Sequence, residues 1–523
     1  MRFPAGVLVV LLAFGGATPA RAQTPGEPRP LSLEDALQLA RPGSEVVGLA
    51  RSAVNRSRGE QIKAKSELFP QLTGSASYSR LIKSQFSSLA STDTTSSRAP
   101  TSCNKFLADP SLPIGARVDS LEKSLQCVSA LNPFGNLGSL PFGRANTYNL
   151  GLSLSQTLFS GGRLGGQIQA ANAGRQSAEL GLRESEAQLT LDVVQAYFDA
   201  ALGDQLSGIA VTALEQADST LRETELRRSL GTVPDFDLLR SRVTRDNQRS
   251  QAIQRASERE LAYLRLKQLL DLPSNTALRL TTVPDDSAMA GVPSLAALLA
   301  AEGDTGSEQR APVRQAALAI RAEEGLLKVA RSQNLPSVAL TSAYGRVAYP
   351  GSGLPSWGQF LTNWSMAVGL TVPLFTGGRI SGDKIVARAN LEDARLRYRQ
   401  SSEFAQLDAR TSLEQLASAR EILRASEGTT AQAVRAYDIA EIRYREGIST
   451  HTELLDARLA LEQARANRAQ AARDALVARM RMALIAQLPL AGAATQVTPS
   501  SATATRRPAA QTQSSATSGF GIP

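Results

Sequence analysis

The chain has 523 residues and a formal net charge of +9 at pH 7, with 57 Lys or Arg, 48 Asp or Glu and one His. The basic excess is spread along polar stretches and is not gathered into a stripe interleaved with aromatic residues, which argues against nucleic acid as a partner. A single His, five Met and the lack of a clustered acid/base motif predict no catalytic residue, no cofactor and no resident metal.

Residues 1–22 have the pattern of a secretory signal peptide. Arg2 precedes an apolar run over residues 7–14, and small residues lead up to Ala22. Cleavage after Ala22 leaves Gln23 first, and because this residue is not Cys we expect no lipid anchor. No later apolar run approaches the roughly 18–20 residues of a membrane helix. The sequence therefore predicts an exported protein that crosses no membrane by helices.

The rest of the chain is predicted to contain two copies of one unit, at residues 23–290 and 291–490. The stretches LFSGGRLGG and LFTGGRISG share six of nine positions and lie 216 residues apart. The same offset relates LGTVPDFDLLRSR to EGISTHTELLDAR. Self-similarity of this kind indicates an internal duplication, and the segments upstream of the first pair show that the first copy carries about 50 residues more.

Each copy contains two predicted strands, at about 70–80 and 147–159 in the first and about 336–346 and 364–375 in the second. In the second strand of each copy, apolar residues alternate with small or polar ones, which is typical of a transmembrane barrel strand. Aromatic residues flank the strands as interfacial girdles do: Phe69, Phe159 and Phe375 at one end, and Tyr78, Tyr148, Tyr344 and Trp364 at the other. A soluble β-sandwich is the alternative. Four strands are too few for a barrel, which needs roughly eight or more.

Between the first two strands, residues 81–146 are predicted to form an extracellular insert. It contains both cysteines of the chain, Cys103 and Cys127. In an exported protein such a pair predicts a disulfide, with two unpaired thiols as the alternative. The C-terminal tail, 491–523, is rich in Ala, Thr, Ser, Gln and Pro, so we expect it to be disordered.

Each copy continues into a long helical hairpin, predicted at 163–270 with its tip near Gly231 and at 379–488 with its tip near Gly447. The first helix of each hairpin lacks proline for some 68 residues and is rich in Ala, Leu, Glu, Gln and Arg. Apolar residues recur at spacings of three, four or seven, which indicates a helix with a packing seam. At 1.5 Å per residue such a helix is about 100 Å long.

A pair of glycines marks each point where a strand gives way to a helix: Gly161 and Gly162 in the first copy, Gly377 and Gly378 in the second. Glycine permits the abrupt backbone turn that such a joint needs. A phosphate-binding loop is the alternative, but the Lys-Ser/Thr of a P-loop is missing. We expect the next residue, Arg163 or Arg379, either to anchor lipid phosphates or to cap neighbouring strands.

Two strands, a Gly-Gly joint and a very long helical hairpin, all duplicated behind a signal peptide, resemble the TolC family of outer-membrane efflux channels. The opening phrase LSLEDALQLARPGSEVVGLARSAVNRSRGEQIKAKSELFPQL and its counterpart RAPVRQAALAIRAEEGLLKVARSQNLPSVAL carry the resemblance, which covers roughly residues 31–488. It implies a mainly α protein with a small transmembrane β-barrel: a homotrimer with a twelve-stranded barrel in the outer membrane and an α-helical coiled-coil tunnel through the periplasm.

The resemblance also implies a function without catalysis. The protein would passively conduct substrates from an inner-membrane pump across the periplasm and outer membrane, in a tripartite efflux or type I secretion system. Its partners would be two further copies of itself, outer-membrane lipid, the pump and a periplasmic adaptor that docks at the tips near Gly231 and Gly447. A periplasmic or secreted coiled-coil structural or adhesion protein without a pore is the main alternative. An adaptor is a further one, but it has one hairpin where this chain has two.

In the TolC family, acidic residues just after the second tip ring the closed entrance, and Glu453 and Asp456 match those positions. Three copies would bring six carboxylates to a narrow mouth and favour cations there. Glu453 also fits the N3 position of a capping box that begins at Thr450, so its role as a gate residue or as a helix cap stays open.

The family's closed state is latched by a Tyr and a basic residue of the second copy that bond to an Asp of the first. Tyr444 matches the Tyr and Asp237 matches the Asp, but Ser449 occupies the position of the basic partner. The resemblance therefore implies half of this latch. His451, the single histidine, lies in a polar turn where we expect it to be solvated.

Overall fold

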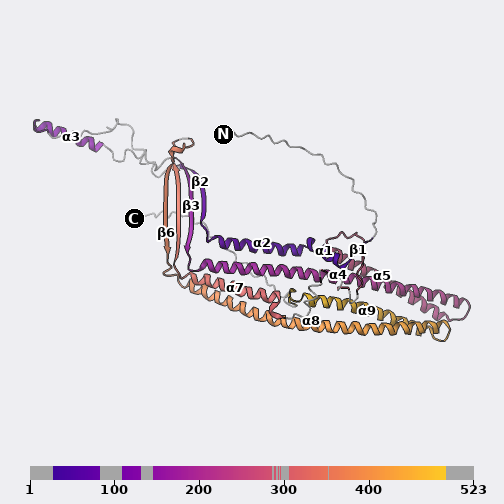
Figure 1. Cartoon of the computed structure of the whole chain (residues 1–523). Helices are drawn as coiled ribbons and strands as arrows, with labels where there is room; N and C mark the ends of the chain where they lie inside the picture. The colour runs from indigo at the N-terminus through magenta and orange to yellow at the C-terminus, as the bar shows by residue number, and fades with distance from the viewer. Residues whose placement is uncertain are drawn as a thin grey trace, which may run out of the picture. The chain divides into compact units, whose positions relative to one another are not determined.

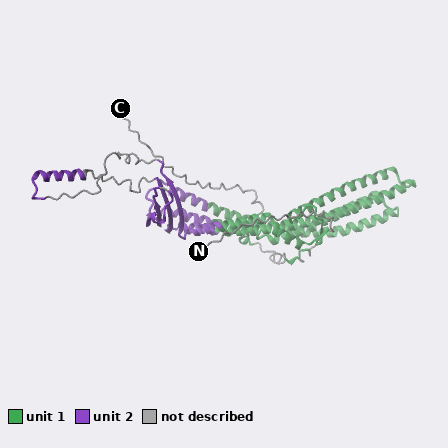
Figure 2. Cartoon of the chain, turned by 90° about the horizontal axis from the view of Figure 1, so that it is seen from above, with its two compact units in different colours: residues 1–58, 173–320, 392–523 green, residues 59–172, 321–391 purple. Residues whose placement is uncertain are grey.

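The computed structural model describes residues 28–82, 109–130, 145–284, 306–351 and 353–490, together with 288–289, 292–293 and 295. The expected signal peptide, the C-terminal tail, Cys103 and a large part of the insert lie outside these residues, so the predicted disulfide stays a prediction. The chain divides into a helical unit (1–58, 173–320 and 392–523) and a sheet unit (59–172 and 321–391), shown in green and purple in Figure 2. Each unit draws on both sequence repeats, so the compact units do not coincide with the repeats.

The four long strands of the sheet unit form one antiparallel sheet in the order β2-β3-β5-β6 (Figure 1). They are β2 (Gln71–Arg80), β3 (Asn146–Phe159), β5 (Ser337–Ala348) and β6 (Leu361–Thr371). β2 pairs with β3 and β5 with β6 inside one repeat, whereas the β3–β5 pair joins the two repeats.

Side chains that lie opposite each other in an antiparallel register share one face of the sheet. One face carries most of the large apolar side chains: Leu72, Tyr78, Tyr148, Leu150, Leu152, Leu154, Val338, Leu340, Tyr344, Trp364, Met366, Val368 and Leu370. The other face carries small or polar residues, among them Thr73, Ser75, Ser77, Asn149, Gly151, Ser153, Ala343, Ser365 and Gly369. The alternation of apolar and small residues therefore extends over all four strands.

The observed strand ends differ from the expected ones in two places. β6 ends at Thr371 and not near 375. Pro373 has no N–H to donate to the ladder, so pairing stops before it. In β3, the register with β5 shifts between Thr157 and Phe159. This irregularity places Phe159 opposite Val338, on the apolar face.

The aromatic residues expected at the far end of the strands lie at two levels. Tyr78 and Tyr148 are opposite each other, with ring centroids 4.8 Å apart. Tyr344 lies between Leu152 and Trp364 in the register. Because Leu152 is four residues further along β3 than Tyr148, Tyr344 and Trp364 lie deeper in the sheet than the outer tyrosine pair.

Helices account for most of the remaining described chain. They are α1 (Leu33–Gly43), α2 (Glu45–Ser66), α3 (Ile114–Ala130), α4 (Arg163–Ser229), α5 (Asp235–Leu269), α7 (Ala311–Ser332), α8 (Arg379–Arg445) and α9 (His451–Leu484). The predicted hairpins correspond to α4 with α5 and to α8 with α9, and both α4 and α8 have 67 residues. α3 lies within the predicted insert. None of the helices in the described part of the chain combines the length and apolar character that a membrane-spanning helix requires.

The main core of the helical unit gathers residues from α1, α4, α5 and α9: Leu33, Leu37, Val193, Val194, Tyr197, Phe198, Leu266, Met480 and Leu484. Tyr197 donates a hydrogen bond to the carbonyl oxygen of Leu31 (2.9 Å) and accepts one from the N–H of Thr282 (3.0 Å). These bonds fix the short parallel pair of β1 (Arg29–Leu31) and β4 (Leu278–Leu280). A reciprocal capping box between Ser32 and Asp35 starts α1 and holds the pKa of Asp35 below its ordinary value.

A buried ion cluster joins three helices of the helical unit. Arg310, directly before α7, is 2% exposed and donates to the carboxylate of Asp408 on α8 (2.7 Å) and to the carbonyl oxygen of Ala405 (3.1 Å). Arg481 of α9 reaches the other oxygen of Asp408 at 3.3 Å. The single carboxylate thus contacts two guanidinium groups from different segments and offsets one of their two positive charges, and burial strengthens its interaction with Arg310.

Two glycines form a close helix–helix crossing in the sheet unit. A Cβ atom added to Gly166 of α4 would lie 2.5 Å from the carbonyl oxygen of Gly325 of α7, and one added to Gly325 would lie 2.6 Å from that of Gly166. Gln169 flanks the crossing, where it donates to the carbonyl oxygen of Arg321 (3.0 Å) and accepts from Lys328 (2.6 Å). The absence of side chains at the two glycines therefore sets how closely α4 and α7 approach.

Candidate functional site

The glycine joints have the same backbone geometry in both repeats. The φ angles of Gly161 and Gly162 are +61° and +90°, and those of Gly377 and Gly378 are +58° and +86°. These values lie in the left-handed region, which glycine enters without a Cβ penalty. A backbone turn of this kind explains why a Gly-Gly pair stands directly before α4 and before α8.

The arginines that follow the joints have partners within the chain. Arg163 forms an ion pair with Glu67 (3.3 Å), and Arg379 forms one with Asp383 (3.1 Å) and donates to Gln333 (2.9 Å). The expected roles as lipid anchors or strand caps are therefore not needed to explain their position, because both guanidinium groups stabilise the segments next to the joint.

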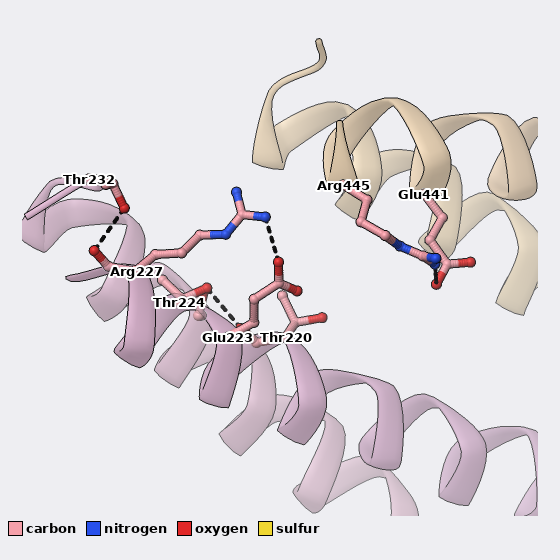
Figure 3. A network of polar contacts seen from close by, with 8 residues as sticks. Thr220, Glu223, Thr224, Arg227, Thr232, Glu441 and Arg445 are labelled. Carbon is pink, nitrogen blue, oxygen red and sulfur yellow. Dashed lines mark hydrogen bonds and ion pairs between the residues drawn. The ribbon is translucent and has the colours of Figure 1, made fainter. Parts of the chain in front are cut away.

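The tip of the first hairpin is a Schellman turn. The N–H of Gly231 donates to the carbonyl oxygen of Arg228 (2.9 Å), and the N–H of Thr232 donates to that of Arg227 (3.0 Å). The hydroxyl of Thr232 adds a further bond to the Arg227 carbonyl at 2.8 Å (Figure 3). With φ at +77°, Gly231 supplies the left-handed residue that this turn requires.

The tip of the second hairpin repeats this turn. The N–H of Gly447, with φ at +73°, donates to the carbonyl oxygen of Tyr444 (3.1 Å), and that of Ile448 donates to Arg443 (2.8 Å). Arg445, in the last turn of α8, pairs with Glu441 at 3.1 Å on the outer surface of the helix (Figure 3). The two tips are therefore built alike, as the duplication predicts.

Tyr444 is the centre of a polar cluster that joins the two tips. The guanidinium carbon of Arg227, on α4, lies 5.3 Å from the centroid of its ring, and the neighbouring side chain of Thr224 on α4 acts to lower the pKa of its phenol. Arg227 also pairs with Glu223 at 2.5 Å, and Thr224 donates to the carbonyl oxygen of Thr220 at 2.8 Å (Figure 3). Burial raises the pKa of Tyr444, so the phenol stays protonated at neutral pH.

Two of the residues that the resemblance assigns to a latch, Asp237 and Tyr444, lie at the same tips. The charge of Asp237 acts on both Tyr444 and His451, so the expected acid lies near the expected Tyr. The basic group over the Tyr444 ring is Arg227 of the first repeat, whereas Ser449 of the second repeat has a buried hydroxyl without a partner in the described chain. The basic neighbour of Tyr444 thus comes from the first repeat.

His451 is buried, and the expectation that it would be solvated is wrong. His451 is the first residue of α9 and is 8% exposed, and its ring centroid lies 5.6 Å from that of Tyr444. Nε2 lies 3.4 Å from the hydroxyl of Ser241 on α5, and this hydroxyl lies 3.3 Å from that of Thr224. A chain of buried polar groups therefore connects α9 through α5 to α4.

We expect the tips to lose stability in mild acid. Burial lowers the pKa of His451, and the positive charge of Arg240 acts in the same direction, against the opposing charges of Asp237 and Glu223. Below about pH 6.5 the unfolded chain binds a proton that the folded tip excludes, so stability falls as pH decreases until the folded pKa is passed. Above about pH 6.5 His451 binds no proton in either state, so this pH dependence of stability vanishes.

The check is hydrogen exchange of the tip amides at neutral and mildly acidic pH. Protection of the tip amides, measured relative to their intrinsic exchange rate at each pH, should decrease in acid for the wild type. His451→Gln, which keeps a hydrogen-bonding group but does not titrate there, should flatten the response. Because the chain has one histidine, its proton resonance reports the pKa directly. A folded pKa at or above the ordinary value contradicts the prediction.

The two acidic residues assigned to the entrance lie on the first turns of α9. Glu453 and Asp456 are three residues apart and exposed, and neither has an ion-pair partner in the described residues. Thr450 caps the helix by accepting a hydrogen bond from the backbone N–H of Glu453 at 3.3 Å. This cap uses the backbone of Glu453 and leaves its carboxylate available to solvent.

The buried members of the tip cluster were missed, although the helical period contains a signal for them. The apolar seam of α4 runs through Ala217 and Leu221, and the next step of three residues reaches Thr224, which is 1% exposed. On α9, His451 is three residues before the buried Leu454. Extending each seam by one step places both polar residues inside.

The described residues contain no group of three or more His, Cys, Asp or Glu side chains arranged to hold a metal ion. The arrangement at the tips is instead a pair of helical turns joined by buried polar contacts, with exposed carboxylates beside the second turn.

The sequence matches the family model described as "Outer membrane efflux protein" over residues 131–271 and 307–486. The chain is 25% identical over 328 residues to the outer membrane protein OprJ of Pseudomonas aeruginosa, a match that spans 60% of this chain and 64% of OprJ. The pyoverdine export outer membrane protein OpmQ of the same species is 24% identical over 436 residues, covering 82% of this chain and 79% of OpmQ.

The fold is similar to that of CusC, a protein whose structures describe transmembrane channel formation. The TM-score is 0.64 with 19% sequence identity, and the match covers 87% of this chain and 92% of CusC. At this identity the likeness concerns the fold: a mainly helical chain with a small antiparallel sheet.

Proposed function

The chain belongs to the outer membrane efflux protein family, and from this premise we propose that it is the outer-membrane exit duct of a tripartite efflux or type I secretion system. The resemblance to TolC channels seen in the sequence is confirmed, and the protein is located in the outer membrane. The family and its structural neighbours are not enzymes. The duct would conduct its substrates passively, while an inner-membrane pump supplies the energy.

The observation that supports a duct most strongly is the sheet, which is incomplete in one chain. In the described residues β2 and β6 each pair along one side, so each has an unpaired edge. A membrane tolerates no open sheet edge because the exposed N–H and C=O groups have no water to bond. Three copies that pair β6 with β2 of the next would give twelve strands, enough to close a barrel.

The apolar face of the sheet supports the same arrangement. Trp364, Met366, Val368 and Leu370 of β6 are each 65–71% exposed in the single chain. A contiguous exposed surface of this kind marks an interaction site, and hydrocarbon lipid matches its chemistry. The opposite face is lined by Ser, Thr, Gly and Ala, as an aqueous lumen requires.

The hairpins support the periplasmic part of the proposal. At about 100 Å, α4 and α8 are long enough to extend far from a membrane surface. In a homotrimer, six such long helices and their six returning partners would form a tunnel wall. The tips at Gly231 and Gly447 would then be the surface that a periplasmic adaptor meets.

The proposal predicts a cation-selective pore whose selectivity depends on Glu453 and Asp456. Three copies bring six exposed carboxylates to one mouth, where they attract cations and bind divalent ions. Single-channel conductance of the purified protein in a planar bilayer, with Glu453→Ala/Asp456→Ala beside the wild type, tests this. We expect cation selectivity and divalent block to decrease several-fold in the variant.

A matched control is Glu403→Ala/Glu414→Ala, which removes two exposed carboxylates from α8 far from the tips. It should leave selectivity unchanged. If the pore conducts but its cation selectivity and divalent block do not change when Glu453 and Asp456 are replaced, the channel function stands and the two residues are not part of the gate. A protein that shows no conductance and forms no trimers in detergent would overturn the proposed function in favour of a coiled-coil structural protein.

A further inference from the structure

Four chain segments flank the end of the sheet at which the strands meet the glycine joints: 60–70, 160–170, 325–336 and 372–385. β2 and β5 begin at this end of the sheet, and β3 and β6 stop there, as the pairs Gln71 with Ser155, Phe159 with Val338 and Ser337 with Thr371 show. Three exposed aromatic residues lie at the same end: Phe69, Phe159 and Phe375. Exposed aromatic rings at one level are typical of a membrane–water interface.

These four segments are strongly basic. They contain seven basic side chains, Lys63, Lys65, Arg163, Lys328, Arg331, Arg379 and Lys384, against three acidic ones, Glu60, Glu67 and Asp383. We call the seven basic residues the basic belt. Each acidic residue is already used by one member of the belt: Glu60 by Lys63, Glu67 by Arg163 and Asp383 by Arg379.

The remaining members of the belt carry an unbalanced positive charge. Lys328 donates to the neutral side chain of Gln169 (2.6 Å) and has no acidic partner in the described residues. Lys65, Arg331 and Lys384 have no ion-pair partner within the described residues, and Lys65 and Arg331 are exposed. An excess of cations next to a row of exposed aromatic rings therefore remains available to an anionic partner outside the chain.

We propose that the members of the basic belt without an acidic partner, Lys65, Lys328, Arg331 and Lys384, bind the phosphate headgroups of anionic phospholipids in the leaflet that faces the glycine joints. This inference rests on the proposed placement of the sheet in the membrane. Phospholipid fits because aromatic rings and flexible cationic side chains together match an interface that is apolar on one side and negatively charged on the other. The attraction acts within about one Debye length, roughly 10 Å at 0.1 M salt, so the headgroups must lie directly against the belt.

The test uses the full-length protein reconstituted in phosphatidylcholine vesicles that contain a minor share of phosphatidylglycerol. After extraction in mild detergent and gel filtration, mass spectrometry measures the lipids retained by the protein. We expect the wild type to retain phosphatidylglycerol about five-fold above its share in the vesicles. The variant Lys65→Ser/Arg331→Ser/Lys384→Ser should retain the two lipids near the vesicle ratio, and high salt should do the same to the wild type.

Two control variants test whether lipid enrichment depends on the position of the basic belt or only on the net charge of the protein. Arg249→Ser/Arg399→Ser/Arg435→Ser removes the same number of positive charges, all of them exposed, from the helical unit and should keep the enrichment. The conservative variant Lys65→Arg/Arg331→Lys/Lys384→Arg should keep it too. Enrichment that is absent in the wild type, lost equally in the helical-unit variant, or displaced by inorganic phosphate at the same concentration overturns the proposal.

Conductance of the same samples distinguishes this proposal from the proposed function. A belt variant that conducts like the wild type but has lost the lipid enrichment supports both. If the wild type conducts ions but shows no enrichment of phosphatidylglycerol, the lipid-binding proposal is wrong and the proposed function stands. If the wild type enriches phosphatidylglycerol but does not conduct ions, the lipid-binding proposal stands and the proposed function is wrong.

Discussion

Replacing Asp408 by Ala is expected to lower the free energy of unfolding by about 3–5 kcal/mol. The carboxylate is 8% exposed and is the acidic partner of both Arg310 and Arg481. Removing it leaves the guanidinium of Arg310, which is 2% exposed, buried without a counter-charge. Breaking one side of a buried pair costs far more than the pair itself contributes, because the remaining charge keeps its desolvation penalty.

The measurement is chemical denaturation at fixed protein concentration, since oligomers gain apparent stability with concentration. Asp393→Ala is the matched control: this carboxylate also pairs with an arginine, Arg397, but at 3.8 Å and in solvent. Its removal should change stability by less than about 1 kcal/mol. A further variant, Arg310→Met/Asp408→Leu, removes both buried charges and should recover part of the loss. Equal effects of Asp408→Ala and Asp393→Ala would contradict the buried-charge explanation.

The repeated architecture was predictable because its signals are local. Glycine pairs before α4 and α8 and single glycines at the tips stand in the sequence at one offset, and each needs the positive φ that the structure gives it. The alternation along β3 and β6 likewise requires no knowledge of partners. Helix length followed from the absence of proline.

The contacts that join distant segments were not predictable in the same way. Arg310 and Asp408 are 98 residues apart, and no local pattern links them. The sequence predicts a solvated His451 because it lies in a polar turn, but the seam of α9 already includes it, and tertiary packing against Tyr444 determines its environment. The helical spacing in the sequence shows that a polar residue lies on the buried face of its helix. Its hydrogen-bonding or ion-pair partner becomes known only when the helices are placed in three dimensions.

The crossing of α4 and α7 gives the second large effect: Gly166→Ala is expected to destabilise the sheet unit by about 1–3 kcal/mol or more. The added Cβ would meet the carbonyl oxygen of Gly325 at 2.5 Å and Val329 at 3.0–3.1 Å. A backbone carbonyl cannot rotate away as a side chain can, so α4 and α7 must move apart. That movement strains the bonds of Gln169 to Arg321 and Lys328 on the flank of the crossing.

The neighbouring glycine supplies the control. Gly165 is in the same turn of α4, but a Cβ there meets nothing within 4 Å in the described chain. Gly165→Ala should be neutral or stabilise by up to about 1 kcal/mol, because alanine loses less backbone entropy than glycine in a helix. Denaturation midpoints of the two single variants, measured side by side, give the test. If both alanines act alike, the close approach of the two backbones is not what requires glycine at 166, and helix propensity alone explains the pair.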